Sequence, residues 1–247
     1  MKLLRPVLVI LFLLLAWQMI VYVGHLPFYI LPGPYKVIDS LFINKNLILN
    51  NLWPTLFEII VGLLIGSIAG VCTAIALSYF DWSRPWILPL LIISQALPIF
   101  AIAPLLVIWF GYGSVSKVVV TTIMIFFPVA SSFYDGLRRT PKDWLDLAQV
   151  MGASPWRLIW SIKIPAALPA LGSGLRVAAT FAPMGAIIGE WVGSSQGLGF
   201  LMINANARMQ IDLLFSTLII LIILTLLLYF TVDLFFKKII FWSNDVE

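Results

Sequence analysis

Few residues in this sequence could carry out covalent or metal chemistry. The 247 residues include one histidine, His25, and one cysteine, Cys72. A histidine-pair metal site and a cysteine cluster each need more such side chains than these supply. The single histidine is expected at the membrane interface and not in a serine–histidine–aspartate triad. No lysine follows a glycine, so the GxxxxGK[ST] phosphate loop of nucleotide hydrolases does not occur. We therefore expect no catalytic site and no metal site.

The most informative polar stretch is TPKDWLDLAQVMGASPWRLIWSIKIPAALP, which covers residues 140–169. Lys142, Asp143, Asp146, Arg157 and Lys163 all fall inside it, although only 11% of the chain is charged. A capped and charged segment within an apolar chain is suited to contact with another protein. Its residue pattern predicts two short helices.

The first of these helices has both of its ends marked in the sequence. Thr140 is a candidate N-cap, Pro141 suits the first helical position, and Asp143 places an acid in the first turn. Gly152 is a typical residue just beyond a helix C-terminus, so we expect the helix to end near Met151.

The second helix is predicted to begin at Ser154 and Pro155, which repeat the start signal. We expect it to run to about Ile162. Pro165 and Pro169 are then expected to end it and to lead into the next apolar segment.

The first helix is amphipathic. Trp144, Leu147, Ala148 and Met151 share one face, with charged and amide side chains largely on the other. A helix this short is marginal alone in water and needs a supporting surface. Two interpretations are open: the helix lies flat on a membrane surface, or it inserts into a groove on a partner protein.

The rest of the chain has the composition of a membrane protein. Its mean hydropathy is +1.05 and 62% of its residues are hydrophobic, far above an ordinary soluble domain. A crossing takes about 20 residues, and only helices satisfy their own backbone in lipid. We predict an all-α bundle forming one domain over residues 1–247, with an uncleaved first span. The six predicted spans are residues 6–24, 56–79, 86–110, 115–134, 172–191 and 213–235.

The basic residues predict the orientation of these spans. With the N-terminus inside, eleven lysines and arginines face the cytoplasm and four face the outside. Both termini are then cytoplasmic, as is the loop at about residues 138–170. The net charge of +4 is explained by this bias, and we expect no nucleic-acid partner.

Several residues within the spans have unusual types. Gly62, Gly66 and Gly70 recur every fourth residue and predict a face where another helix approaches closely. Polar groups and prolines inside spans are expected to face the bundle interior or a path through it. The candidates for lining such a path are Gln95, Pro98, Met184 and Glu190.

At residues 146–165 the sequence resembles a known motif. Asp146-Leu147-Ala148, three residues, Gly152, nine residues and Ile162-Lys163-Ile164-Pro165 resemble the EAA loop of ABC-importer permeases. The family pattern is Glu-Ala-Ala, three residues, Gly, nine residues, then Ile, any residue and Leu-Pro. The spacing is intact, while Asp146, Leu147 and Ile164 depart from the pattern.

The resemblance extends over most of the chain. Leu31–Pro34 and Gly197–Gly199 are similar to segments of the nitrate, sulfonate and taurine branch of these permeases. The segment Gly189–Asp212, together with Glu58, looks most like permeases for the pyrimidine precursor of thiamin. The resemblance implies a type I importer permease of the bacterial inner membrane, carrying such a precursor or, alternatively, a sulfonate, taurine or nitrate.

The resemblance also implies partners. These are two ATPase subunits, which carry ATP and Mg²⁺, a second permease copy, and an extracytoplasmic solute-binding protein. No cofactor is expected in this chain. The residues expected to couple it to the ATPase are Trp144, Asp146, Leu147, Ala148, Met151, Gly152, Ala153, Arg157 and Pro165.

Three other classes of membrane protein fit the sequence less well. Secondary transporters usually carry charges inside their spans for ion coupling. In the predicted spans, Glu58, Glu190 and Asp233 all lie near the ends. A membrane-embedded enzyme would need catalytic or metal-binding side chains that this chain lacks. A purely structural subunit does not account for the capped loop.

Overall fold

The computed structural model describes residues 4–240 and 242. Every secondary-structure element in this part of the chain is helical, as predicted. The elements are α1 (Leu4–Val23), α2 (Pro34–Ile43), α3 (Lys45–Tyr79), η1 (Asp81–Ser83), α4 (Arg84–Ala96), α5 (Ile99–Phe110), α6 (Ser114–Arg138), α7 (Lys142–Val150), α8 (Pro155–Leu158), η2 (Ile159–Lys163), α9 (Ile164–Gly193), α10 (Leu198–Ala207) and α11 (Ile211–Ile239).

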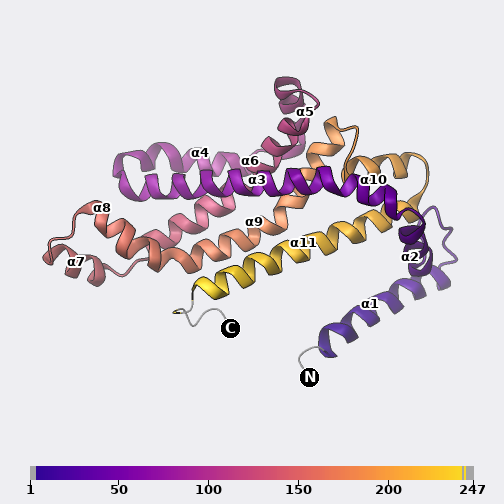
Figure 1. Cartoon of the computed structure of the whole chain (residues 1–247), viewed down its shortest axis with the longest axis horizontal. Coiled ribbons are helices and arrows are strands. Elements are labelled where there is room, and N and C mark those ends of the chain that lie inside the picture. The colour runs from indigo at the N-terminus through magenta and orange to yellow at the C-terminus, as the bar shows by residue number, and fades with distance from the viewer. Residues whose placement is uncertain (1–3, 241, 243–247) are drawn as a thin grey trace.

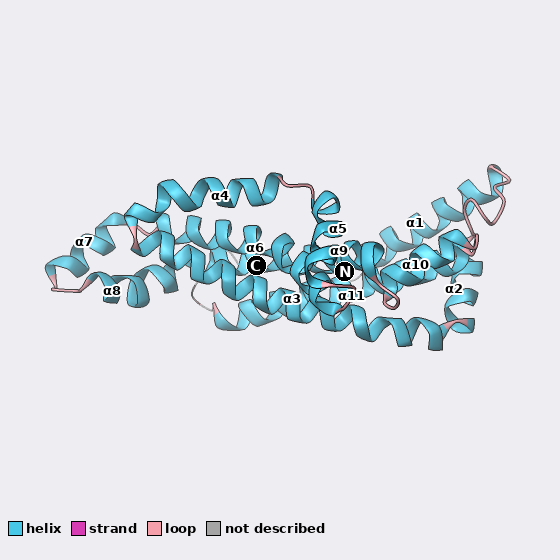
Figure 2. Ribbon diagram, turned by 90° about the horizontal axis from the view of Figure 1, so that it is seen from above, coloured by secondary structure: helices cyan, strands magenta, loops and turns pink. Residues whose placement is uncertain are grey.

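The long helices lie along the long axis of the molecule. In Figure 1, α3, α6, α9 and α11 form the body, α7 and α8 project at one end, and α2 and α10 cover the other. Figure 2 shows the same two ends after a quarter turn. The loop at residues 140–163 is therefore separated from α10 by the full length of the bundle.

Four helical stretches in the described residues are long and apolar enough to cross a membrane: Lys45–Tyr79, Ser114–Arg138, Pro155–Gly193 and Ile211–Ile239. They coincide with four of the six predicted spans, although each extends beyond the predicted bounds. The first predicted span forms α1, whose described apolar part, Leu8–Val23, is shorter than these four.

The predicted third span, at residues 86–110, does not form one continuous helix. The segment forms two helices, α4 and α5, bent by 100° at Leu97 and Pro98. Pro98 has no N–H to donate and disfavours helical geometry at the residue before it. Leu97 accordingly has an extended ψ of 122°. If the bent pair counts as one crossing, the described residues contain five candidate crossings in all.

Helix α6 lies between α3 and α9 and packs closely against both. On the α3 side, a Cβ atom at Gly62 would lie 2.7 Å from Thr121 Cβ. At Gly66 and Gly70 it would lie 3.0 Å from backbone atoms of α6. Glycines four residues apart thus let the two backbones approach along this face.

On the α9 side the small residues have the same effect. A Cβ atom at Gly174 would lie 2.9 Å from the carbonyl oxygen of Pro128. At Gly185 and Gly189 it would lie 2.9 Å from the Cα atoms of Thr121 and Lys117. Bulky side chains on α1, α3, α4 and α11 remain exposed, as expected for helices that face lipid.

Replacing Gly66 by valine should destabilise the protein, because the new side chain meets backbone atoms that cannot move independently. Overpacking of this kind costs about 1–3 kcal/mol, so we expect a clearly lower thermal midpoint in detergent. Gly113→Val is the matched control, since Gly113 has a φ of −80° and open space around it. Equal midpoints for the two variants would contradict the close α3–α6 contact.

Candidate functional site

Residues 140–163 form a projecting helical arm, made of α7, α8 and the turn η2. The apolar side chains of α7 are uncovered in this chain: Leu147 is 63% exposed and Met151 78%. An exposed apolar face on a short helix needs a surface to cover it. The arm is therefore the first candidate for a site of contact.

Gly152 makes the sharp turn between the two helices of the arm. Its φ is +80°, a region that favours glycine. Its N–H donates to the carbonyl of Gln149, and the N–H of Ala153 donates to Ala148, each at 2.9 Å. This pair of bonds is a Schellman motif, which satisfies the last carbonyls of the helix.

The start of α7 differs from the prediction. Pro141 is the N-cap, while Thr140 lies one residue earlier. The Thr140 hydroxyl donates to the carbonyl of Leu137 at 3.1 Å and so closes the end of α6. The predicted Thr140 cap is therefore wrong, because α7 begins one residue too late for Thr140 to hold the cap position.

The second helix begins as predicted but does not end where predicted. Ser154 caps it by accepting the N–H of Arg157 at 3.3 Å, with Pro155 in the first position. The chain then continues through η2, a π-helical turn, directly into α9. Pro165 lies in the first turn of α9, where its missing N–H is tolerated, so it does not break the helix.

The base of the arm is held against the α3–α4 turn by aromatic rings. The ring of Trp156 packs edge-on against Tyr79, with centroids 5.7 Å apart, and lies 5.5 Å from Trp160. The Lys163 ammonium donates to Ser78 Oγ at 3.5 Å. The arm therefore contacts the end of α3 and also continues directly into α9.

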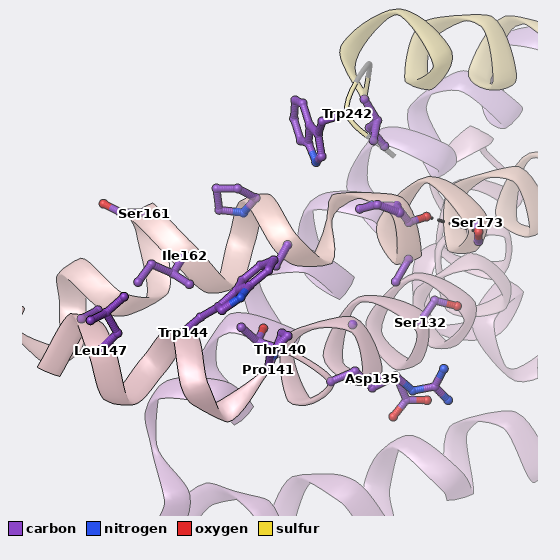
Figure 3. A pocket seen from close by; sticks show the side chains of 18 of the residues that line it. Ser132, Asp135, Thr140, Pro141, Trp144, Leu147, Ser161, Ile162, Ser173 and Trp242 are labelled. Atoms are coloured by element: carbon purple, nitrogen blue, oxygen red, sulfur yellow. Dashed lines mark hydrogen bonds between the residues drawn. The ribbon is translucent and has the colours of Figure 1, made fainter. Parts of the chain in front are cut away.

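The arm and the bundle enclose an open groove of about 1070 Å³ (Figure 3). Trp144 and Leu147 point into it from α7, toward Ile162 on the facing helix. Arg139 and Arg176 line it further along. Behind the groove, Arg176 Nε pairs with Asp233 at 2.8 Å, and Lys237 joins the same carboxylate at 3.2 Å.

The structure divides the predicted coupling residues into two groups. Trp144, Leu147, Ala148, Met151 and Pro165 line the groove together. The remaining predicted residues lie outside it, on the outer side and tip of the arm: Asp146, Gly152, Ala153 and Arg157. Both groups belong to the one projecting element.

The residues predicted to line a path do not gather in this chain. Gln95 and Pro98 are exposed at the break between α4 and α5, where Gln95 borders a small hollow of about 70 Å³. Met184 is 52% exposed on α9. Glu190, in contrast, is 1% exposed and enclosed by protein.

Some contacts were not predicted from the sequence. The Arg176–Asp233–Lys237 network was missed, although Asp233 and Lys237 have i,i+4 spacing that favours an ion pair. Glu58 was placed near the end of a span, yet α3 starts at Lys45, so Glu58 lies well inside the helix and is fully buried.

Comparisons with known proteins agree with this arrangement. The model of the family "Binding-protein-dependent transport system inner membrane component" matches residues 62–240. A protein of Haemophilus influenzae, named "Probable ABC transporter permease protein", is 51% identical and covers 98% of both chains. The "Formylaminopyrimidine transport permease protein ThiX" of Halalkalibacterium halodurans is 34% identical, over 80% of this chain and 79% of that one.

The fold also matches a solved transporter. A chain in an inward-facing structure of the MetNI methionine ABC transporter superposes with a TM-score of 0.69 at 19% identity. The match covers 79% of this chain and 97% of that one. With a family model spanning more than half of its length, this chain belongs to the inner-membrane permease components of binding-protein-dependent ABC transporters.

Proposed function

We propose that this permease carries a small nitrogen heterocycle, of the thiamin pyrimidine-precursor class, through the inner membrane, and that a separate ATPase drives it through the helical arm. The chain itself is the transmembrane, non-catalytic component of an ABC importer. The observation that carries the coupling part of the proposal is the uncovered apolar face of α7 beside the groove.

In this proposal two copies of the permease pair, and each presents one arm to one of two ATPase subunits. ATP and Mg²⁺ are held by the ATPase. When the ATPase dimer closes, it draws the arms together, and the continuous helix from α8 through η2 into α9 moves with them. Rigid-body movement of this kind suits packed bundles with two alternative arrangements.

The proposed orientation places the arm and both termini in the cytoplasm, with α2 and α10 on the outer side. The excess of lysine and arginine on the arm side supports it. We expect the solute-binding protein to bind on the outer side, at α10 with its exposed Asn206 and at the exposed residues after it, Arg208 and Gln210.

The proposed substrate rests on similarity. The relative named for formylaminopyrimidine transport is 34% identical to this chain over 198 aligned residues. The segment Gly189–Asp212, whose resemblance pointed to the same class, forms the end of α9 and the whole of α10. Sulfonates, taurine and nitrate are the alternative substrates.

The proposal is tested with the permease, the ATPase and the binding protein encoded beside it, reconstituted in proteoliposomes. We expect ATP-dependent uptake of a formylated or hydroxymethylated aminopyrimidine, and calorimetric binding of the same compound by the binding protein. Uptake of taurine, an alkyl sulfonate or nitrate instead would replace the substrate assignment. ATP-independent uptake driven by a proton or sodium gradient would overturn the coupling mechanism.

A cysteine at Gln95 should report on the path. Gln95 lies at the break between α4 and α5, so we expect its surroundings to change between transport states. In a Cys72→Ser background, labelling of Gln95→Cys should differ several-fold between the nucleotide-free and ATP-trapped complexes. Ile108→Cys is the control, since the Ile108 side chain is 75% exposed on α5, away from the break. An unvarying rate at Gln95 contradicts its place on the path.

A further inference from the structure

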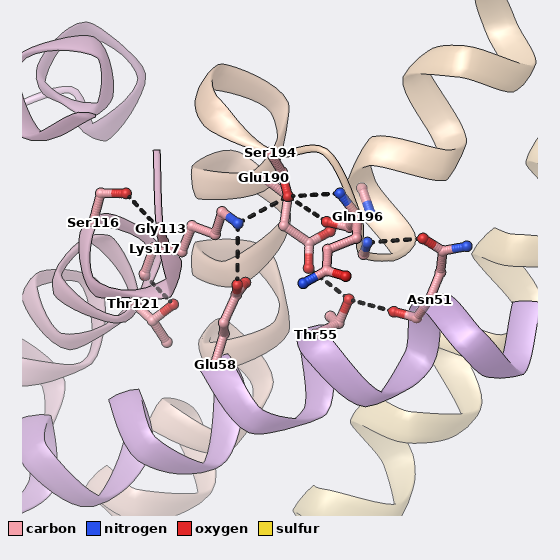
Figure 4. Close-up of polar contacts among 12 residues, drawn as sticks. Asn51, Thr55, Glu58, Gly113, Ser116, Lys117, Thr121, Glu190, Ser194 and Gln196 are labelled. Carbon is pink, nitrogen blue, oxygen red and sulfur yellow. Dashed lines mark hydrogen bonds and ion pairs between the residues drawn. The ribbon is translucent and has the colours of Figure 1, made fainter. Parts of the chain in front are cut away.

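Four buried polar side chains from three helices meet at the α10 end of the bundle. Thr55 and Glu58 come from α3, Lys117 from α6 and Glu190 from α9, and none is more than 3% exposed. Thr55 and Glu58 are three residues apart, so they share one face of α3. Together they form a cluster that we call the buried lock (Figure 4).

Lys117 links α6 to both neighbouring helices. Its ammonium lies 3.4 Å from Glu58 Oε1 on α3. The same ammonium donates to Ser194 Oγ, directly after α9, at 2.8 Å. Gly189 allows this contact, because a Cβ there would lie 2.9 Å from the Lys117 Cα. These two contacts of Lys117 thus join α3, α6 and α9 to one another.

Glu190 and Thr55 hold the start of α10. Thr55 donates to Glu190 Oε1 at 2.5 Å and accepts the N–H of Leu198 at 2.8 Å. Glu190 Oε2 accepts the N–H of Gly199 at 2.5 Å. Asn51 Oδ1 accepts the N–H of Gly197 at 2.9 Å. These are N–H groups that a helix start leaves unpaired, and a carboxylate there also suits the helix dipole.

Gly197 shows how tightly the carboxylate fits. Its φ is +114°, and a Cβ atom there would collide with the carboxyl group of Glu190. The turn between α9 and α10 is thus built around this side chain. Three ionisable groups buried in this way are costly, and apolar residues of similar size would pack without that cost. Their presence calls for a role beyond packing.

We propose that four positioning residues fix α10 on α3, α6 and α9: Thr55, Glu58, Lys117 and Glu190. Because α10 is fixed, a movement that the docked binding protein imposes on it is passed on to these three helices. The proposal rests on the proposed function for its docking partner. The surface that α10 presents is exposed at Ile203, and the exposed residues Asn206 to Gln210 continue it. Any loosening of the helix start would tilt that surface relative to the bundle.

The test compares wild type, Glu190→Gln, Lys117→Met and Thr55→Val in the full transporter with its ATPase. Asp39→Asn, an exposed carboxylate on α2, is the control. Hydrogen exchange is followed for the peptide covering residues 197–201 and for α7. ATPase activity is then measured against the concentration of binding protein, which separates half-saturation from the maximal and basal rates.

We expect exchange at residues 197–201 to rise about 10-fold or more in Glu190→Gln, as follows from losing a hydrogen bond to a charged group, while α7 is unchanged. Half-saturation should need several-fold more binding protein, with basal ATPase activity like that of wild type. Thr55→Val, the mildest change, keeps the test decisive if the charge variants fail to assemble.

Two results overturn the proposal: unchanged exchange at 197–201, or a parallel fall of basal and stimulated rates with unchanged half-saturation. The exchange measurement does not need the binding protein. A wild-type complex that no binding protein stimulates therefore counts against the proposed function, while local exchange still decides whether the lock holds α10.

Discussion

Gly152→Val is expected to uncouple ATP hydrolysis from transport, reducing uptake about tenfold or more while the protein still inserts in the membrane. Gly152 has a φ of +80°, and valine in this region costs at least about 1–2 kcal/mol. The Schellman motif that orients α7 against α8 would be lost, and the arm would present its apolar face in another direction. Uptake and ATPase activity are measured together in proteoliposomes.

Two control variants distinguish the effect of the positive φ at Gly152 from the effect of adding a side chain. Gly152 and Gly113 both have open space where a side chain would go, but only Gly152 has a positive φ. Gly113→Val should therefore transport almost normally. Gly152→Asn should recover much of the activity, because asparagine tolerates the left-handed region. Normal transport by Gly152→Val would remove the turn from the mechanism.

Leu147→Asp is expected to release the ATPase. Leu147 is 63% exposed in this chain and lies on the groove side of α7. If the ATPase covers it, the lost apolar contact alone is worth about 1.5–3 kcal/mol, or roughly 10- to 100-fold in affinity. A carboxylate in the same pocket adds the cost of burying a charge. Co-purification of the ATPase, followed by titration of the detergent-solubilised complex, measures the effect.

Gln149→Asp is the matched control, since it places the same carboxylate on the other face of the same helix. It should retain the ATPase with an affinity close to that of wild type. If Leu147→Asp also retains the ATPase, α7 is not held through its apolar face. The interpretation of α7 as a helix lying on the lipid surface would then be favoured.

The sequence predicted the helical arm well because its signals are local. Gly152 and Ser154 mark a helix end and a helix start through bonds made within a few residues. The prediction for Thr140 fails because this residue lies between two helices, and its hydroxyl bonds to the end of α6 instead of capping α7. Pro165 was misread because a π-helical turn precedes it, and local propensity does not reveal that turn.

The bundle was predicted where apolar length decides the outcome. Four spans follow from hydropathy alone, whereas the 100° break at Leu97–Pro98 depends on a single proline among several. Pro89 and Pro104 lie within α4 and α5 without ending them. Sequence patterns therefore located the prolines but did not identify the one that breaks the segment.

The buried lock could not be assembled from the sequence. Glu58, Lys117 and Glu190 are far apart in the chain and meet only because α6 packs between α3 and α9. Their contact depends on long-range packing that periodicity does not encode. One signal was nevertheless present in the sequence, because ionisable residues within apolar helices usually pair with polar groups on neighbouring helices.

The most direct test of the account is cross-linking from the arm to the ATPase. In a Cys72→Ser background, Leu147→Cys carries a short photoactivatable cross-linker in the assembled transporter. The account predicts a product with the nucleotide-hydrolysing subunit, and labelling by an impermeant thiol reagent only when the cytoplasmic face is open. Labelling from the outside of intact cells, or a complete complex that yields no such product, would contradict it.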